Sequence, residues 1–99
     1  MTLLARIKRC ALLGRIVFTY KATDERVRDD LSELEILESL VNATEITKTL
    51  RSTRSRHREY LHVITSPTAA GIWIYTKGKF VDDQGVETYY LLISAKLAE

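Results

Sequence analysis

Several residue types are scarce in this chain, and each scarcity excludes a class of structure or chemistry. A single cysteine, Cys10, cannot form an internal disulfide. One proline and four glycines are too few for a low-complexity segment. Apolar runs fall far short of the ~20 residues that a membrane-spanning helix needs, and basic residues interrupt the first of them, so no signal-peptide core is expected. We therefore expect a protein of the reducing cytoplasm without membrane association.

Motifs for cofactor-dependent chemistry are also missing. The sequence has no glycine-rich phosphate loop, no Gly-x-Ser-x-Gly elbow and no paired cysteines, and its only histidines are His57 and His62. The acidic residues between 24 and 38 have no His or Cys at metal-ligand spacing. These acids are interpreted as a solvated helix face, with an acidic docking patch as the alternative. We predict no metal site and no cofactor.

What the chain does have is an ordinary globular composition with segregated charge. Its 99 residues are 45% hydrophobic, enough for one domain that spans residues 1–99. The net charge is only +2, yet residues 46–65 carry five basic side chains and one acidic. Clustered arginines beside an aromatic, lysine-bearing sheet face are typical of a protein that binds a polyanion.

The N-terminal half predicts three helices and two short strands. Apolar residues recur at three- and four-residue spacing over residues 2–13, which predicts an amphipathic helix. Residues 15–20 are β-branched and aromatic, as in a short strand. Thr23 is the expected N-cap of a second helix that buries Val27 and Leu31.

A third helix is predicted to begin at Ser32, which forms a Ser-x-x-Glu capping box with Glu35, and to end at Asn42. Its expected apolar stripe is Leu34, Leu37, Leu40 and Val41. The β-branched residues of 44–50 predict a strand that carries Lys48, and residues 51–59 are expected to form a polar, arginine-rich loop.

Three strands are predicted between Tyr60 and Leu97, separated by Ser66-Pro67 and by residues 82–85. Alternation along the middle strand places Trp73, Tyr75, Lys77 and Lys79 on one face. In the last strand it groups Tyr90, Leu92, Ser94 and Lys96 against Tyr89, Leu91, Ile93, Ala95 and Leu97. The predicted fold class is α+β, an antiparallel sheet with a C-terminal meander packed against about three α-helices. Tyr75, Lys77 and Lys96 are expected to share an open surface.

Lysine, arginine, tyrosine and histidine groups suit the stabilisation of a pentacovalent phosphate and proton transfer to its oxygens. That is the chemistry of metal-free RNA cleavage. Histidine fits proton transfer because its pKa lies near neutrality. His62 is therefore a candidate, although a histidine on a strand more often packs among its neighbours, here Tyr60 and Ile64. Tyr75 is likewise either a functional group or a packing residue.

Four segments resemble the MqsR-type toxins of bacterial toxin-antitoxin systems, which are mRNA interferases with a RelE-like fold. These segments are IKRCALLGRIVFT near the start, ITKTLRSTRS in the middle, GIWIYTKGKF in the predicted meander and LLISAKLAE at the end. The resemblance covers nearly the whole chain. The usual Ser-Phe-Lys ending reads Ser94-Ala95-Lys96 here, and the turn at residues 82–85 is longer.

The resemblance implies catalytic roles for Lys48, Tyr75 and Lys96. The family's polar residue on the third strand falls near either Tyr60 or His62. With Arg58, the candidate catalytic set is Lys48, His62, Tyr75, Lys96 and Arg58. The candidate RNA-binding set is Arg51, Arg54, Arg56, Trp73 and Lys77.

The resemblance also implies single-stranded mRNA as substrate, a cognate antitoxin protein as partner, and a reaction on or off the ribosome. The first hypothesis is thus a sequence-specific endoribonuclease that acts as a toxin. The second is a non-catalytic RNA- or protein-binding module that uses the same basic, aromatic face. A structural partner protein would require that face to be buried.

Overall fold

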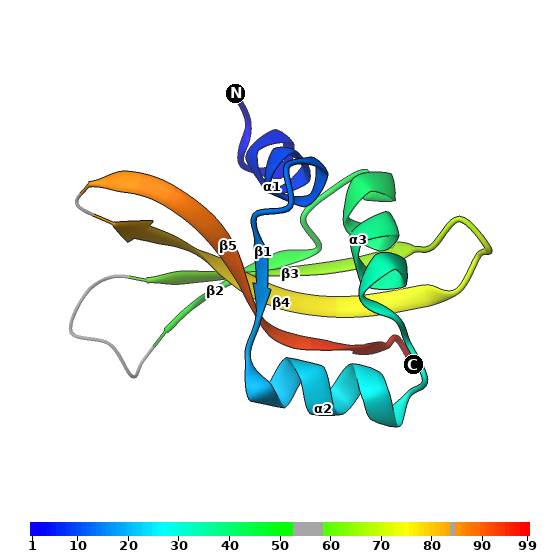
Figure 1. Cartoon of the computed structure of the whole chain (residues 1–99). Coiled ribbons are helices and arrows are strands. Elements are labelled where there is room, and N and C mark those ends of the chain that lie inside the picture. Colours follow the sequence, from blue (N-terminus) through cyan, green and yellow to red (C-terminus); the bar gives the residue numbers. More distant parts are fainter. Residues whose placement is uncertain (53–58, 84) are drawn as a thin grey trace.

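The computed structural model describes residues 1–52, 59–83 and 85–99, with side chains described except at 83 and 86–88 (Figure 1). The described residues form three helices and five strands. In chain order these are α1 (Leu3–Leu12), β1 (Ile16–Phe18), α2 (Tyr20–Arg28), α3 (Glu33–Asn42), β2 (Lys48–Arg51), β3 (Tyr60–Pro67), β4 (Trp73–Asp83) and β5 (Val86–Leu97). None of the helices in this part of the chain is long and apolar enough to cross a membrane.

The strands form one sheet in the order β1-β5-β4-β3-β2. Strands β2 to β5 pair antiparallel with their neighbours in sequence, and β1 pairs parallel to β5. Helices packed on a mostly antiparallel sheet define the α+β class, so the predicted class is confirmed. The strand predicted at 44–50 is shorter and shifted, because β2 begins at Lys48 and includes Arg51.

Each helix begins at a hydroxyl residue with extended backbone whose side chain accepts a hydrogen bond from an N–H group of the first turn. Thr2 accepts from Ala5 N, and Ser32 forms the predicted capping box with Glu35. The second helix begins earlier than predicted. Its N-cap is Thr19, which accepts from Ala22 N at 3.1 Å, and Thr23 lies inside α2.

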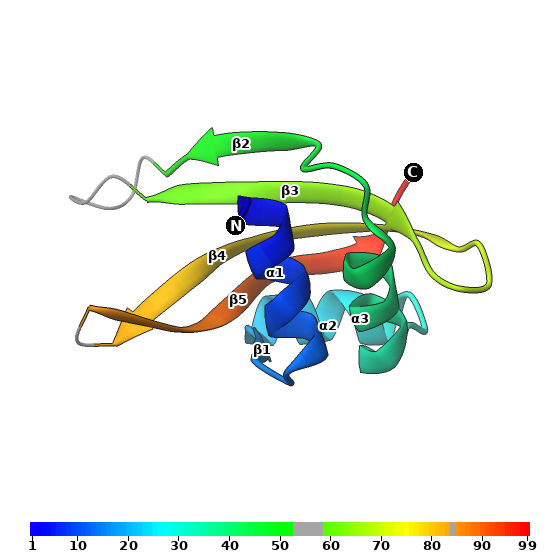
Figure 2. The ribbon, with the colours of Figure 1, turned by 90° about the horizontal axis from the view of Figure 1, so that it is seen from above.

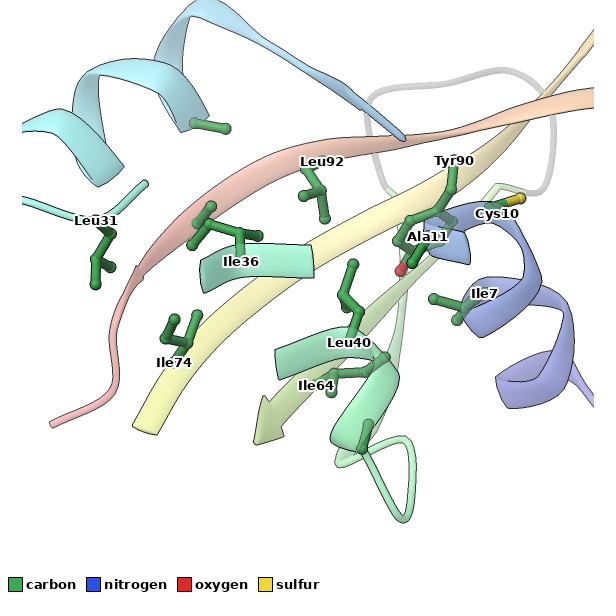
Figure 3. Packing of buried hydrophobic residues seen from close by; sticks show 13 residues of the cluster. Ile7, Cys10, Ala11, Leu31, Ile36, Leu40, Ile64, Ile74, Tyr90 and Leu92 are labelled. Atoms are coloured by element: carbon green, nitrogen blue, oxygen red, sulfur yellow. The ribbon is translucent and has the colours of Figure 1, made fainter. Parts of the chain in front are cut away.

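The core lies between the sheet and the helices α1 and α3, which cover one face of it (Figure 2). Its fully buried side chains come from both layers (Figure 3): Ile7, Ile36, Leu40, Ile64, Ile74, Tyr90 and Leu92. Two predicted core positions are wrong. Val27 and Leu34 are 60% and 65% exposed, because α2 lies along a sheet edge and α3 buries Ile36 instead.

A β-bulge in β5 reverses part of the predicted alternation. Gly78 pairs with Leu92 and Lys77 pairs with Ser94, which leaves Ile93 as the extra residue. Partners in an antiparallel pair share a face. Tyr90 and Leu92 therefore lie on the helix-covered face with Ala95, and all three are fully buried. Strict alternation along β5 is thus a wrong prediction.

Candidate nucleic-acid interface

The sheet face opposite α1 and α3 (Figure 2) carries the basic and aromatic residues, and α2 borders it along β5, where Glu25 binds Ser94. We call it the open face. The strand register defines its members: Lys48, Val63, Lys77 and Ser94 form one row across four strands, and Thr65, Tyr75 and Lys96 form the next. Neighbouring strands lie about 5 Å apart, so side chains in adjacent positions of a row are within contact distance.

Tyr75 and Lys96 are two candidate residues that lie side by side on the open face. They are register partners on β4 and β5, and the Lys96 Nζ lies 5.4 Å from the centre of the Tyr75 ring. A cation over an aromatic face is attracted by the ring quadrupole. Both side chains line a hollow of about 380 Å³ together with Thr65 and the C-terminal residues. The predicted shared surface for these two residues is therefore present.

Lys77 lies next to this pair, and Lys48 lies two strands away in the row of Lys77. None of Lys48, Lys77 and Lys96 forms an ion pair with a residue that the structure describes. Lys79, by contrast, donates to Glu59 Oε2 at 2.9 Å, which neutralises much of its charge. The open face thus carries three lysine ammonium groups near the aromatic side chains of β4, Trp73 and Tyr75.

His62 lies on the opposite, helix-covered face, because its register partner on β4 is Gly78 rather than Tyr75 or Lys77. Its side chain is 5% exposed and its Nδ1 lies 3.3 Å from Thr49 Oγ1. Its ring also contacts the edge of Phe80. Burial, together with the nearby charge of Arg6, lowers the pKa of His62. The structure therefore does not bring His62 together with Tyr75 and Lys96.

A hollow of about 730 Å³ adjoins His62 at this end of the sheet, between the start of α1 and the strands β2 to β4. Tyr60, the alternative to His62 on the third strand, lines the same hollow. It lies two residues before His62 on β3 and therefore on the same face of the sheet. The third-strand residue that does face Tyr75 is Thr65, which we did not predict as a site residue. Only the pairing of Thr65 with Tyr75 in the sheet register identifies Thr65 as a residue of the candidate site.

The predicted RNA-binding residues are distributed over both faces. Trp73 lies two residues before Tyr75 on β4, on the same face, and is 55% exposed. Arg51 is exposed but pairs with Tyr60, which places it with His62 rather than with Tyr75. Arg54, Arg56 and Arg58 lie outside the described residues.

Two carboxylates that sequence reasoning assigned to a solvated face, Glu25 in α2 and Asp29 at its C-cap, bind the edge of β5 instead. Glu25 Oε1 accepts hydrogen bonds from Ser94 Oγ at 2.6 Å and from Ala95 N at 3.2 Å. Asp29 Oδ2 accepts from Leu97 N at 2.9 Å. Burial raises the pKa of Glu25, but these hydrogen bonds and the charges of Lys21 and Lys96 outweigh it and leave the pKa lowered.

Among the described side chains, no three His, Cys, Asp or Glu residues gather as the ligands of a metal ion would. The ionisable groups that the open face does carry include the ammonium groups of Lys48, Lys77 and Lys96 and the phenol of Tyr75. Comparisons with protein-family models, with curated proteins and with solved structures find no match for this chain. The geometry of the open face, together with the resemblance seen in the sequence, is what bears on function.

Proposed function

We propose that the open face binds single-stranded RNA and cleaves it as a metal-independent endoribonuclease. The observation that carries this proposal is the Tyr75–Lys96 pair, in which the Lys96 ammonium lies 5.4 Å from the centre of the Tyr75 ring on the open face, with Lys77 beside them. An extended RNA strand offers both phosphates for the lysines and bases for stacking on Trp73.

In the proposed reaction the RNA 2′-hydroxyl attacks the adjacent phosphorus and displaces the 5′-oxygen of the next nucleotide. The products are a 2′,3′-cyclic phosphate and a free 5′-hydroxyl. Lys96 and Lys77 neutralise the charge that develops on the equatorial oxygens. The Tyr75 phenol donates a proton to the departing 5′-oxygen, and the proton of the 2′-hydroxyl passes to water. His62 has no part in this scheme because it lies on the other face.

The biological role that we propose is that of a toxin of a toxin-antitoxin system with a RelE-like fold. Its support is the resemblance to MqsR-type toxins, in which Lys48, Tyr75 and Lys96 occupy the positions of functional residues. All three fall on the open face. A cognate antitoxin that covers this face would block access of cytoplasmic mRNA, whether the mRNA is free or bound to the ribosome.

The test is cleavage of a long, end-labelled mRNA by the purified protein in EDTA. Tyr75→Phe and Lys96→Met should each abolish the cuts while the protein stays folded. Tyr20→Phe is the matched control, since it deletes a phenol hydroxyl from a side chain that is 93% exposed on α2. Cleavage that persists in Tyr75→Phe would reject the proton-transfer role of Tyr75, and cleavage that requires a divalent ion would reject the metal-independent mechanism.

A second candidate function is RNA binding without cleavage on the same face. The position of His62 favours it, because this histidine, a residue type suited to proton transfer near neutral pH, lies on the other face. Tight RNA binding with no cutting, in either the presence or the absence of ribosomes, would establish this alternative.

A further inference from the structure

The edge of β5 changes its partner midway along the strand. Up to Leu92 it pairs with β1, and beyond that point α2 takes the place of a neighbouring strand (Figure 1). Thr19 lies at the point where the partner of β5 changes from β1 to α2. Its N–H donates to Leu92 O at 3.0 Å and its hydroxyl donates to Ile93 O at 3.3 Å. Ile93 is the bulged residue, so the partner change and the face reversal occur at the same place.

Past the bulge, side chains of α2 and of its C-cap residue satisfy backbone N–H groups that a strand would otherwise bind. Glu25 accepts a hydrogen bond from the N–H of Ala95, and Asp29 accepts one from the N–H of Leu97. The spacing of these groups explains the match. Residues i and i+4 of a helix are about 6 Å apart along its axis, and residues two apart in a strand are about 6.8 Å apart.

We infer that Glu25 and Asp29 are positioning residues for the Tyr75–Lys96 pair, holding β5 in the bulged register that turns Lys96 toward the open face. They accept hydrogen bonds from the backbone N–H groups of Ala95 and Leu97, the two residues that flank Lys96 in sequence. Without the extra residue at position 93, every later side chain of β5 would change face, and Lys96 would lie on the helix-covered side. This inference rests on the proposed function, since it assigns the two carboxylates to the same site.

The electrostatics agree with the geometry. Glu25 forms an ion pair with Lys21 at 3.6 Å, and its side chain is 13% exposed. The charge of Lys96 is among the interactions that lower the pKa of Glu25. A carboxylate at position 25 thus stays ionised at neutral pH and retains both hydrogen bonds to β5.

The experiment compares four proteins by single-turnover cleavage: wild type, Glu25→Ala, Glu25→Gln and Asp24→Ala. The glutamine retains an oxygen that can accept from Ser94 and Ala95, and Asp24 is an exposed carboxylate on the same helix. Glu25→Ala should lose about 10- to 100-fold in cleavage rate, the scale set by small misplacements of reacting groups. Glu25→Gln and Asp24→Ala should stay within about threefold of wild type, and the affinity for a non-cleavable 2′-O-methyl RNA should change by less than about threefold in all four.

Two NMR measurements report on position independently of activity. In wild type the side-chain methylene protons of Lys96 should carry the ring-current shift of Tyr75, and the Ala95 amide should exchange slowly with solvent. Both should be lost in Glu25→Ala and kept in Glu25→Gln, at a temperature where all variants are folded by circular dichroism. Retention of the ring-current shift in Glu25→Ala, or cleavage at the wild-type rate, would overturn the inference. A wild type that does not cleave RNA would defeat the proposed function, and the ring-current shift would still decide whether Glu25 positions Lys96.

Discussion

Of the four glycines, Gly78 is the one where an added methyl group would meet close neighbours. It lies in the interior of β4, where a Cβ would come within 2.6 Å of Tyr90 Cε2 and 2.8 Å of the Leu91 carbonyl oxygen. The carbonyl belongs to the paired strand β5, and the Tyr90 ring is fully buried against Phe80 at a centroid distance of 5.1 Å. Neither neighbour can move aside without disturbing the core.

Gly78→Ala should therefore lower the free energy of unfolding by about 1–3 kcal/mol, the usual cost of an overpacked core. The lower backbone entropy of the unfolded alanine chain offsets only about 0.4–1 kcal/mol in the other direction. For a chain of this size each kcal/mol corresponds to about 4–8 °C in melting temperature. Urea unfolding followed by circular dichroism measures the change directly.

A matched double variant separates overpacking from other effects of the substitution. Tyr90→Leu shortens the side chain above Gly78, so Gly78→Ala should cost less in the Tyr90→Leu background than in wild type. The difference between the two costs is the coupling energy of the cycle. A Gly78→Ala protein as stable as wild type, or the same cost in both backgrounds, would refute the packing of Tyr90 over Gly78.

Four further predictions follow from single contacts. Tyr90→Phe should leave the free energy of unfolding unchanged or raise it by up to about 1 kcal/mol in urea unfolding, because the buried Oη finds no hydrogen-bond partner among the described residues. Because burial and Arg6 lower the pKa of His62 from 6.5, the unfolded chain binds a proton first as the pH falls. The free energy of unfolding should then decrease from about pH 6.5 downward. In His62→Gln the urea midpoint should depend less on pH between about pH 7.5 and pH 5. The pKa of Glu25 is also lowered, so its contribution to stability is present above the ordinary value of 4.5 and is lost on further acidification; Glu25→Gln should remove that part of the acid slope. Trp73→Ala should weaken single-stranded RNA binding by about 1–3 kcal/mol in fluorescence anisotropy, while its thermal melt stays close to wild type because the side chain is 55% exposed.

The sequence predicts the elements of this fold well where a periodic pattern and a cap coincide. The helix from Ser32 to Asn42 is an example, since its capping box and its last helical residue are both as predicted. The second helix is not, because Thr19 and Thr23 are equally good caps on residue type. The choice between them depends on the hydrogen bonds of Thr19 to Leu92 and Ile93 of β5, which lie more than 70 residues later in the sequence.

Burial on α2 and α3 is harder to predict than the helices themselves. A helix pattern assigns apolar residues to the core by default, and this gives Val27 and Leu34, both of which are exposed. Helix α2 lies along the sheet edge, where its inward side chains include Ala22 and Glu25, with Asp29 at its C-cap. Because an acidic residue on a helix usually faces solvent, nothing in the local sequence distinguishes Glu25 and Asp29 from Asp24.

The candidate site shows the same division between local pattern and tertiary pairing. Alternation along β4 correctly places Trp73, Tyr75 and Lys77 on one face, since β4 is regular over these residues. The sequence reaches the right face for Lys96 relative to Tyr75, but its grouping of Lys96 with Tyr90 and Leu92 is wrong.

The bulge at Ile93 decides which residues of β5 lie on each face. The first part of β5 supplies Tyr90 and Leu92 to the core, and after the bulge Ala95 continues the core while Lys96 reaches the open face. A regular strand would place Lys96 on the same side as Leu92, against buried apolar residues where an unpaired ammonium group is costly. The carboxylates of Glu25 and Asp29 hold the register that avoids this cost. The stability of β5 and the composition of the open face therefore depend on the same few hydrogen bonds, so variants of Glu25 and Asp29 should be assayed for both.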